Sequence, residues 1–251
     1  IWVERPEARR AIEEVAAAVG ADLLLGPETA RLEIVEDRGW EGQRLNLQTA
    51  ENRYQLSLLL GGYHQAKNAA LAVLGAEILA GRGWERLDHE AIVAGAGGSR
   101  WPGRLERVDL PGGRSVLLDV AHNPDGAEAL ARFLDRRELT YDLLFGVLAD
   151  KDVGEILPVL AAKARRVTLT SPHSHRALPP EEIERLLPAG RVDVVPAAPP
   201  ALDSALAGDP ELLVVCGSVY LVGEIRELLR ERFGAPSPAV SDLGDSHQRA
   251  S

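Results

Sequence analysis

Strand-like and helix-like segments alternate between residues 104 and 233, and this alternation restricts the fold more than any other feature. The apolar strand candidates are residues 105–110, 115–120, 141–147, 166–170, 191–195 and 211–216, and the helix candidates are residues 124–135, 153–164, 180–187, 199–207 and 219–233. Strands that alternate with helices form a mostly parallel sheet covered by helices on both faces. We therefore expect an α/β fold with a Rossmann-like sheet, in which residues 105–110 form an antiparallel edge strand.

The first hundred residues predict a smaller α/β unit that contains a β-meander. The helix candidates are residues 6–19, 64–80 and 87–94, and the strand candidates are residues 22–25, 31–36, 43–49 and 54–60. Residues 95–102 are rich in glycine and predict an irregular linker. The predicted domains are therefore residues 1–98 and 99–234. Residues 235–251 are rich in Ser, Pro and Asp, and they predict a disordered tail.

Composition excludes several classes of protein. A net charge of -10 argues against nucleic acid as a partner, because such proteins need a basic face. The single Cys216 excludes an intrachain disulfide framework and a cysteine metal cluster. Without a signal peptide or a run of 18 apolar residues, we expect a cytoplasmic protein that does not bind membranes. Because the chain has no Met and begins with Ile1, we expect a piece of a longer protein or a processed product.

Residues 116–126, with the sequence VLLDVAHNPDG, predict a strand, a short polar turn and the start of a helix. Asn123 suits the N-cap position, and Pro124 suits the first helical position. Open α/β sheets bind ligands at the carboxyl ends of their strands, and a helix start attracts phosphate or carboxylate. We therefore expect Asp119 and His122 to face a ligand. The alternative is that Asp119 caps backbone groups and His122 is a surface loop residue.

Other polar loops are expected at the same edge of the sheet, namely residues 148–152, 171–176 and 217–218. Together with residues 119–123 they offer carboxylates, imidazoles, Lys151, Arg176 and Ser218, a set that suits an anionic ligand. Ser218 alternatively suits a simple N-cap role, and Cys216 is more typical of a core residue than of a nucleophile. The sequence contains neither a G-x-S-x-G motif nor a G-x-G-x-x-G motif after a strand.

Two further residues near the predicted domain boundary could bind a nucleotide. Arg104 follows the boundary, and its guanidinium can bind a phosphate with two hydrogen bonds, although an exposed Arg in a turn is the alternative. Asn68 lies one helical turn beyond His64, and its amide can pair with the edge of a nucleobase. The alternative places Asn68 in a buried polar contact, with His64 and Gln65 capping the helix.

Four segments, in this order, resemble the bacterial folylpolyglutamate synthase and dihydrofolate synthase group of the Mur ligase superfamily. They are GGYHQAKNAA at residues 61–70, WPGRLE at 101–106, LLDVAHNP at 117–124 and CGSVYLVGE at 216–224, and GVLADKD at 146–152 also fits. The resemblance spans residues 1–233 and implies the end of a central ATPase domain followed by a Mur ligase C-terminal domain. It implies an ATP-dependent ligase that phosphorylates a folate or dihydropteroate carboxylate, after which the amine of L-glutamate attacks the acyl phosphate.

The resemblance also implies roles for individual residues. Asn68 would contact the adenine, Arg104 the ATP phosphates and Asp119 the ribose. His122 would act near the terminal phosphate and the incoming glutamate, and Ser218 would help to hold that glutamate. These side chains would converge on a nucleotide cleft between two lobes. The implied cofactors are ATP and Mg²⁺, and the resemblance suggests a monomer.

The chain departs from this family in one respect. The family's ATPase half carries a P-loop of the type G-x-x-G-K-[ST] and the Mg²⁺ ligands, which the family places upstream of residue 1, and this sequence contains no G-K dipeptide. We therefore expect the chain alone to be inactive as a ligase. The alternatives are another Mur-type amino-acid ligase, such as one that acts on a cell-wall precursor, and a non-catalytic nucleotide-binding module.

Overall fold

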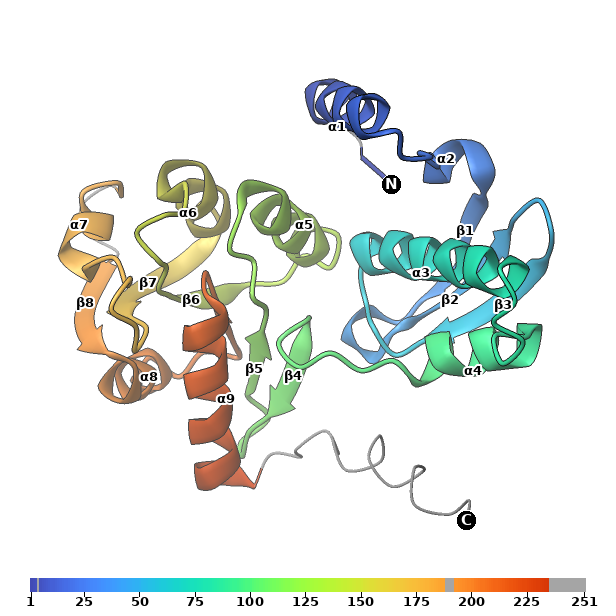
Figure 1. Cartoon of the computed structure of the whole chain (residues 1–251). Helices are drawn as coiled ribbons and strands as arrows, with labels where there is room; N and C mark the ends of the chain where they lie inside the picture. The colour runs from blue at the N-terminus through green and yellow to red at the C-terminus, as the bar shows by residue number, and fades with distance from the viewer. Residues whose placement is uncertain (4, 188–191, 235–251) are drawn as a thin grey trace, which may run out of the picture. The chain divides into compact units, whose positions relative to one another are not determined.

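The computed structural model describes residues 1–3, 5–187 and 192–234, so the tail predicted at residues 235–251 lies outside the described residues. The chain divides into two compact units, Ile1–Arg100 and Trp101–Ser251 (Figure 1). The first unit holds a three-stranded sheet and the second a six-stranded sheet, which confirms the predicted α/β fold. Within the described ranges, every helix is too short or too polar to cross a membrane.

The first unit contains the predicted β-meander. Its elements are α1 (Pro6–Val19), α2 (Gly26–Thr29), β1 (Arg31–Asp37), the 3-10 helix η1 (Gly39–Glu41), β2 (Gln43–Gln48), β3 (Arg53–Leu58), α3 (Tyr63–Gly81) and α4 (His89–Gly98). The strand predicted at residues 22–25 is wrong, because these residues connect α1 to α2 and pair with no described strand. Pro27 fixes a helical φ at the start of α2, which ends the extended segment.

One face of this small sheet packs against α3 and α4. Leu45 and Leu56 alternate with exposed polar residues along β2 and β3, and both are buried in a cluster with Ala66 and Ile92. The predicted irregular linker is wrong for residues 95–98, because α4 continues to Gly98. A Cβ at Gly97 would lie 3.3 Å from the carbonyl oxygen of Ser57, so glycine there allows α4 to pack closely on β3.

The second unit contains the Rossmann-like sheet, with strand order β4-β5-β9-β6-β7-β8. Its strands are β4 (Glu106–Asp109), β5 (Ser115–Leu118), β6 (Tyr141–Phe145), β7 (Ala164–Ser171), β8 (Val192–Ala197) and β9 (Leu212–Cys216). The edge strand β4 pairs antiparallel with β5, and all other neighbouring strands are parallel. Both features confirm the sequence prediction.

Helices cover both faces of this sheet, as the alternation predicts. The helices are α5 (Pro124–Asp135), α6 (Val153–Ala161), α7 (Pro180–Glu184), α8 (Ala198–Ala207) and α9 (Val219–Phe233). Helices α8 and α9 pack with Leu118, Leu144 and Val215 on one face, and α5 and α6 lie on the other (Figure 1). Because both faces are covered, every residue of β5, β6 and β9 is buried, and most of these residues are apolar.

The parallel strands place their following loops at one edge of the sheet, the carboxyl edge. Directly after the strands, Gly217 N donates a hydrogen bond to Val120 O, and Gly146 N donates to Cys216 O. Gly217 has a φ of +105°, and a Cβ on it would lie 2.7 Å from Gly146 O. The loops after β5, β6 and β9 therefore meet as closely as backbones can, which brings their polar side chains to one place.

Candidate functional site

Asp119 follows β5 directly and lies buried at the carboxyl edge, with 4% of its surface exposed. Its Oδ2 accepts a hydrogen bond from Leu105 N at 3.0 Å, and its Oδ1 accepts one from Ala121 N at 3.0 Å. Burial raises the pKa of Asp119 to about 6, against the lowering by these two hydrogen bonds and by Arg104. The carboxylate thus joins two loops, as the capping alternative predicts, and each oxygen keeps a lone pair for a hydroxyl donor.

Arg104 lies in a tight turn beside this carboxylate. Its neighbours Gly103 and Leu105 both have positive φ angles, +71° and +49°. Among the described residues, the Arg104 guanidinium has no hydrogen bond or ion pair, yet it is close enough to lower the pKa of both Asp119 and His122. The turn therefore presents at the carboxyl edge a guanidinium that the described part of the chain leaves available to an anion.

His122 lies in the loop between β5 and α5 and is partly buried. Burial lowers its pKa most, the cations Lys151 and Arg104 lower it further, and Asp150 acts in the opposite direction. The imidazole is therefore neutral at neutral pH. In this state it has one nitrogen that can accept a proton or a hydrogen bond.

Two cations share one carboxylate next to His122. Asp150 Oδ2 lies 3.0 Å from Lys151 Nζ, and Asp150 Oδ1 accepts from Arg176 Nη2 at 2.8 Å. Hydrogen bonds from these two residues hold the pKa of Asp150 at about 2. The three groups carry a net positive charge, so this part of an acidic protein suits an anionic ligand.

Ser218 and Asn123 start the two helices that face this edge. Ser218 is buried, and its Oγ accepts a hydrogen bond from Tyr220 N at 3.1 Å at the start of α9. Asn123 Oδ1 accepts from Gly126 N at 2.8 Å at the start of α5. Asn123 is the predicted N-cap, and Ser218 has the N-cap role that the alternative gave it, although its hydroxyl still has a hydrogen to donate. Cys216 lies fully buried, and burial raises its pKa well above the ordinary value, as expected for a core thiol.

Asn68 belongs to the first unit, unlike the other predicted site residues. It lies exposed on the second turn of α3, and its Nδ2 donates a hydrogen bond to Gln65 Oε1 at 3.4 Å. The structure thus brings Arg104, Asp119, His122 and Ser218 together within the second unit. The alternative of a buried polar contact is wrong for Asn68, because the residue is exposed.

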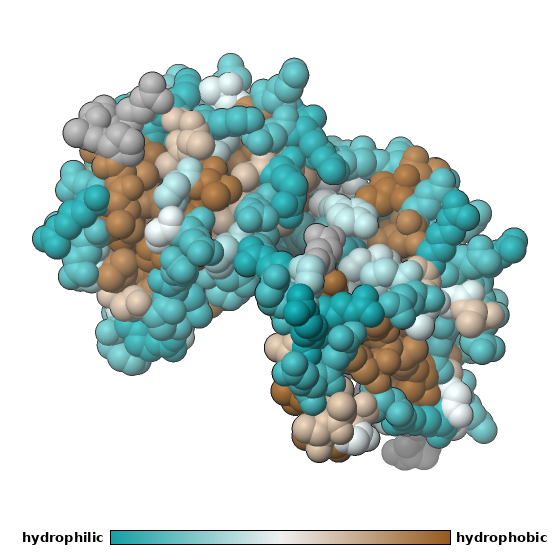
Figure 2. Space-filling model, turned by 90° about the horizontal axis from the view of Figure 1, so that it is seen from above, coloured by the Kyte–Doolittle hydropathy of each residue, from teal (hydrophilic) through white to brown (hydrophobic). Residues whose placement is uncertain are grey.

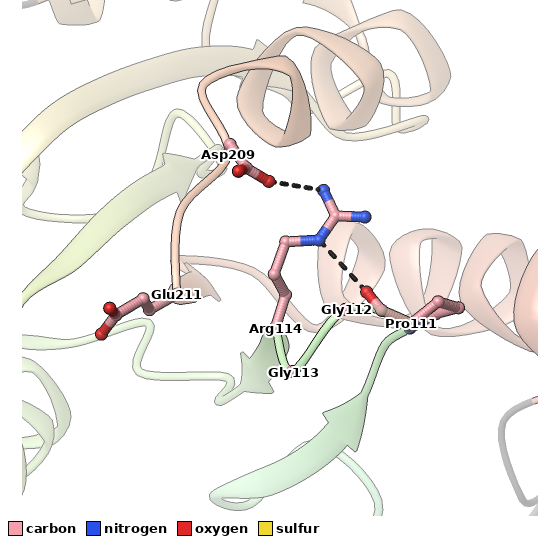
Figure 3. Close-up of a pocket in the computed structure, with 6 residues that line it drawn as sticks. All are labelled: Pro111, Gly112, Gly113, Arg114, Asp209 and Glu211. Atoms are coloured by element: carbon pink, nitrogen blue, oxygen red, sulfur yellow. Dashed lines mark hydrogen bonds and ion pairs between the residues drawn. The ribbon is translucent and has the colours of Figure 1, made fainter.

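A depression elsewhere on the second unit does not coincide with these residues. It has a volume of about 500 Å³ and lies at the start of β5 and β9, at the opposite end of these strands (Figure 3). Arg114 lines it and is already engaged by Asp209, at 3.2 Å, and by Pro111 O. The face of the molecule in Figure 2 carries hydrophobic patches between hydrophilic residues. The convergence of charged groups, rather than cavity size, identifies the carboxyl edge.

Sequence reasoning missed the residues that support this site. Glu106 accepts hydrogen bonds from Gly103 N, at 2.8 Å, and from Arg226 Nε on α9. Glu224, also on α9, accepts one from His173 N in the loop that carries Arg176. The segments WPGRLE and CGSVYLVGE contain both glutamates, but nothing in the sequence connects the two segments.

Comparisons with known proteins find similar sequences. Residues 103–219 match the family model for the Mur ligase glutamate ligase domain. The chain is 35% identical to the dihydrofolate synthase/folylpolyglutamate synthase of Mycobacterium tuberculosis over 240 residues, 85% of this chain and 48% of that protein. It is 30% identical over 229 residues to the folylpolyglutamate synthase of Lacticaseibacillus casei, 89% of this chain and 52% of that protein.

Solved structures lead to the same group. The crystal structure of the M. tuberculosis folylpolyglutamate synthase complexed with ADP and AMPPCP superimposes with a TM-score of 0.76 and 31% identity. The match covers 91% of this chain and 54% of that one. The chain therefore spans about half the length of the relatives it matches.

Proposed function

Because this chain carries a Mur ligase C-terminal domain and is homologous to folylpolyglutamate and dihydrofolate synthases, we propose that the whole protein joins L-glutamate to a folate or dihydropteroate carboxylate with ATP. The terminal phosphoryl group of ATP passes to that carboxylate and ADP leaves. The amine of glutamate then attacks the acyl phosphate, and phosphate leaves. The observation that carries the proposal is the Arg104 guanidinium beside Asp119 and His122 at the carboxyl edge, which forms no ion pair with a described residue.

In this proposal, cations of the second unit stabilise the transferring phosphoryl group. Phosphoryl transfer is catalysed mainly by positioning and by positive charge around the phosphate oxygens. Arg104 is oriented by its turn rather than by an ion pair, so it can donate to phosphate oxygens without first breaking a contact with a described residue. Its planar guanidinium suits two parallel hydrogen bonds to phosphate.

The adjacent loops suit the binding and activation of glutamate. Lys151 and Arg176 place two cations where a substrate carboxylate can share them with Asp150. Ser218 has a hydroxyl hydrogen to donate to the same substrate. The neutral His122 imidazole can accept the proton that the glutamate ammonium must lose before its nitrogen attacks the carbonyl carbon.

The proposal assigns the ribose of ATP to Asp119. Asp119 accepts hydrogen bonds from ribose hydroxyls through its remaining lone pairs. Asn68 belongs to the first unit, and its contact with an adenine edge stays a prediction from the sequence. The proposed cofactor Mg²⁺ would bind together with ATP. The described residues hold no group of three His, Cys, Asp or Glu side chains that could bind a metal ion. No step here therefore uses a metal ligand from these residues.

The test measures ADP release by the polypeptide translated from the complete reading frame that contains these 251 residues. We expect release to require both glutamate and either dihydropteroate or a reduced folate, and the substitution R104A to reduce it about 100-fold. The matched control R114A removes an arginine at the opposite edge and should leave the rate unchanged. The 251 residues alone should release no ADP.

Different results would contradict different parts of the proposal. Release that depends on a cell-wall peptide precursor instead of a folate would assign the protein to another Mur-type ligase. ATP binding without release under any substrate would indicate a non-catalytic nucleotide-binding module. Robust turnover by the 251 residues alone would refute the expected inactivity of this chain.

A further inference from the structure

An ion pair from a distant helix holds the turn that carries Arg104. Arg226 on α9 donates from Nε to Glu106 Oε1 at 2.9 Å and to Oε2 at 3.0 Å. The two side chains are only 21% and 18% exposed, so water screens the pair weakly. Glu106 Oε2 also accepts a hydrogen bond from Gly103 N at 2.8 Å. A continuous set of contacts therefore leads from α9 to the residue before Arg104.

The turn itself has a backbone conformation that needs external support. Leu105 is fully buried, yet it has a φ of +49°, a conformation that non-glycine residues adopt rarely and keep only where their surroundings fix it. Gly103 has a φ of +71°, and a Cβ on it would lie 2.8 Å from Val222 Cγ1 on α9. Because both neighbours of Arg104 are in this region, the direction of its side chain depends on what holds the turn.

Three hydrogen bonds connect this turn to the rest of the site. Val120 N donates to Gly103 O at 2.9 Å, and Leu105 N donates to Asp119 Oδ2 at 3.0 Å. The third is the bond from Gly103 N to Glu106, the only one of the three whose acceptor is itself oriented by an ion pair with α9. Loss of the Arg226 guanidinium would leave the Glu106 carboxylate partly buried without its counter-charge, and the carboxylate would turn towards water.

We propose that Arg226 is a positioning residue for the nucleotide phosphates: through Glu106 it fixes the turn at residues 103–105 and thereby keeps the Arg104 guanidinium beside Asp119 and His122. This inference rests on the proposed contact between Arg104 and ATP. A displacement of about 1 Å is enough to reduce the rate of an enzyme about 100-fold. Arg226 therefore affects ATP binding and turnover without touching ATP.

The experiment is a double-mutant cycle in the full reading-frame polypeptide, with the KM for ATP, kcat and the thermal unfolding midpoint measured for each variant. R226M keeps the length of the side chain and removes its charge, whereas R226K keeps the charge. R230M is the matched control, because Arg230 lies one turn further along α9 in an exposed pair with Glu227. We expect R226M to raise the KM for ATP about 10-fold, R226K to recover part of this change, and R230M to have no effect.

The effects of R226M and R104A on the KM for ATP should not be additive, because a positioning residue acts only through Arg104. In an R104A background, R226M should change the KM for ATP by less than about 2-fold. Equal 10-fold effects in both backgrounds, or an unchanged KM in R226M where R104A raises it, would overturn the inference while leaving the proposed function intact. An unchanged KM in R104A would instead refute the contact between Arg104 and ATP. As a readout without catalysis, R226M should speed amide exchange at Gly103 and leave residues 141–145 unchanged.

Discussion

Asp119 should make the second unit less stable as the pH rises, and the substitution Asp119→Asn should remove this dependence. The carboxyl group is buried in the folded protein, with a pKa of about 6, and solvated in the unfolded chain, with an ordinary value of 3.8. Between these two values the folded state binds the proton more tightly than the unfolded state does. Stability contributed by the protonated group is therefore complete below about pH 3.8 and is lost as the pH rises through about 6.

The size of the effect follows from the two pKa values. Integration of the difference in proton binding gives a cost of about 1 kcal/mol at pH 4.5 and about 3 kcal/mol at pH 7.5. The variant carries an amide that never ionises. The amide oxygen can accept a hydrogen bond from either Leu105 N or Ala121 N, but the NH₂ group must then face the other N–H donor. This mismatch destabilises the variant by an amount that does not depend on pH. The deficit of the variant relative to wild type should thus shrink by about 2 kcal/mol between these pH values.

Urea unfolding at a series of pH values measures this deficit, with amide exchange at residues 115–118 assigning the transition to the second unit. The control is Glu181→Gln, which neutralises an exposed carboxylate on α7 in the same unit. We expect the control and wild-type curves to run parallel while the Asp119→Asn curve converges on them with rising pH. Parallel curves for Asp119→Asn would refute the argument, because burial would then not disfavour the ionised carboxylate.

Three further predictions concern the carboxyl edge and the core below it. Because the pKa of His122 is lowered in the folded protein, protonation of the imidazole destabilises the folded state as the pH falls. Lys151→Met should move this pKa back towards its ordinary value in an NMR titration. An unchanged pKa in Lys151→Met would contradict the assigned contribution of Lys151. Thr170 Oγ1 is buried and has no hydrogen-bond partner among residues 1–3, 5–187 and 192–234, so Thr170→Val should stabilise the unit by about 1 kcal/mol in urea unfolding. A clear loss of stability would show that the hydroxyl has a partner such as water. Gly217→Ala places a Cβ 2.7 Å from Gly146 O at a φ of +105° and should lower the free energy of unfolding by about 2 kcal/mol or more; unchanged stability would mean that the loops can separate without loss.

Part of the site follows from local sequence. The pattern VLLDVAHNPDG contains an apolar strand, an N-cap and a proline, and α5 begins at Pro124 as these residues predict. The parallel sheet then places Asp119, His122, Lys151 and Ser218 at one edge, because strands that run in the same direction end on the same side. None of this requires knowledge of which strands are neighbours.

Other features of the site depend on contacts between residues far apart in the chain. The position of β9 between β5 and β6 brings α9 against the turn that holds Arg104, and no sequence pattern gives that strand order. The bond between Arg226 and Glu106 joins residues 120 positions apart. The raised pKa of Asp119 likewise depends on burial, which sequence spacing does not report.

Local sequence patterns were sufficient to predict the α/β class, the antiparallel edge strand, the helix starts and the edge of the sheet at which polar residues gather. These features depend on hydrophobic periodicity and helix capping, which involve residues that are close together in the sequence. Three features could be seen only in the folded chain: residues 22–25 form no strand, α4 extends to Gly98, and α9 supports the turn of Arg104. These outcomes depend on which surfaces pack together, and packing is a property of the whole folded chain.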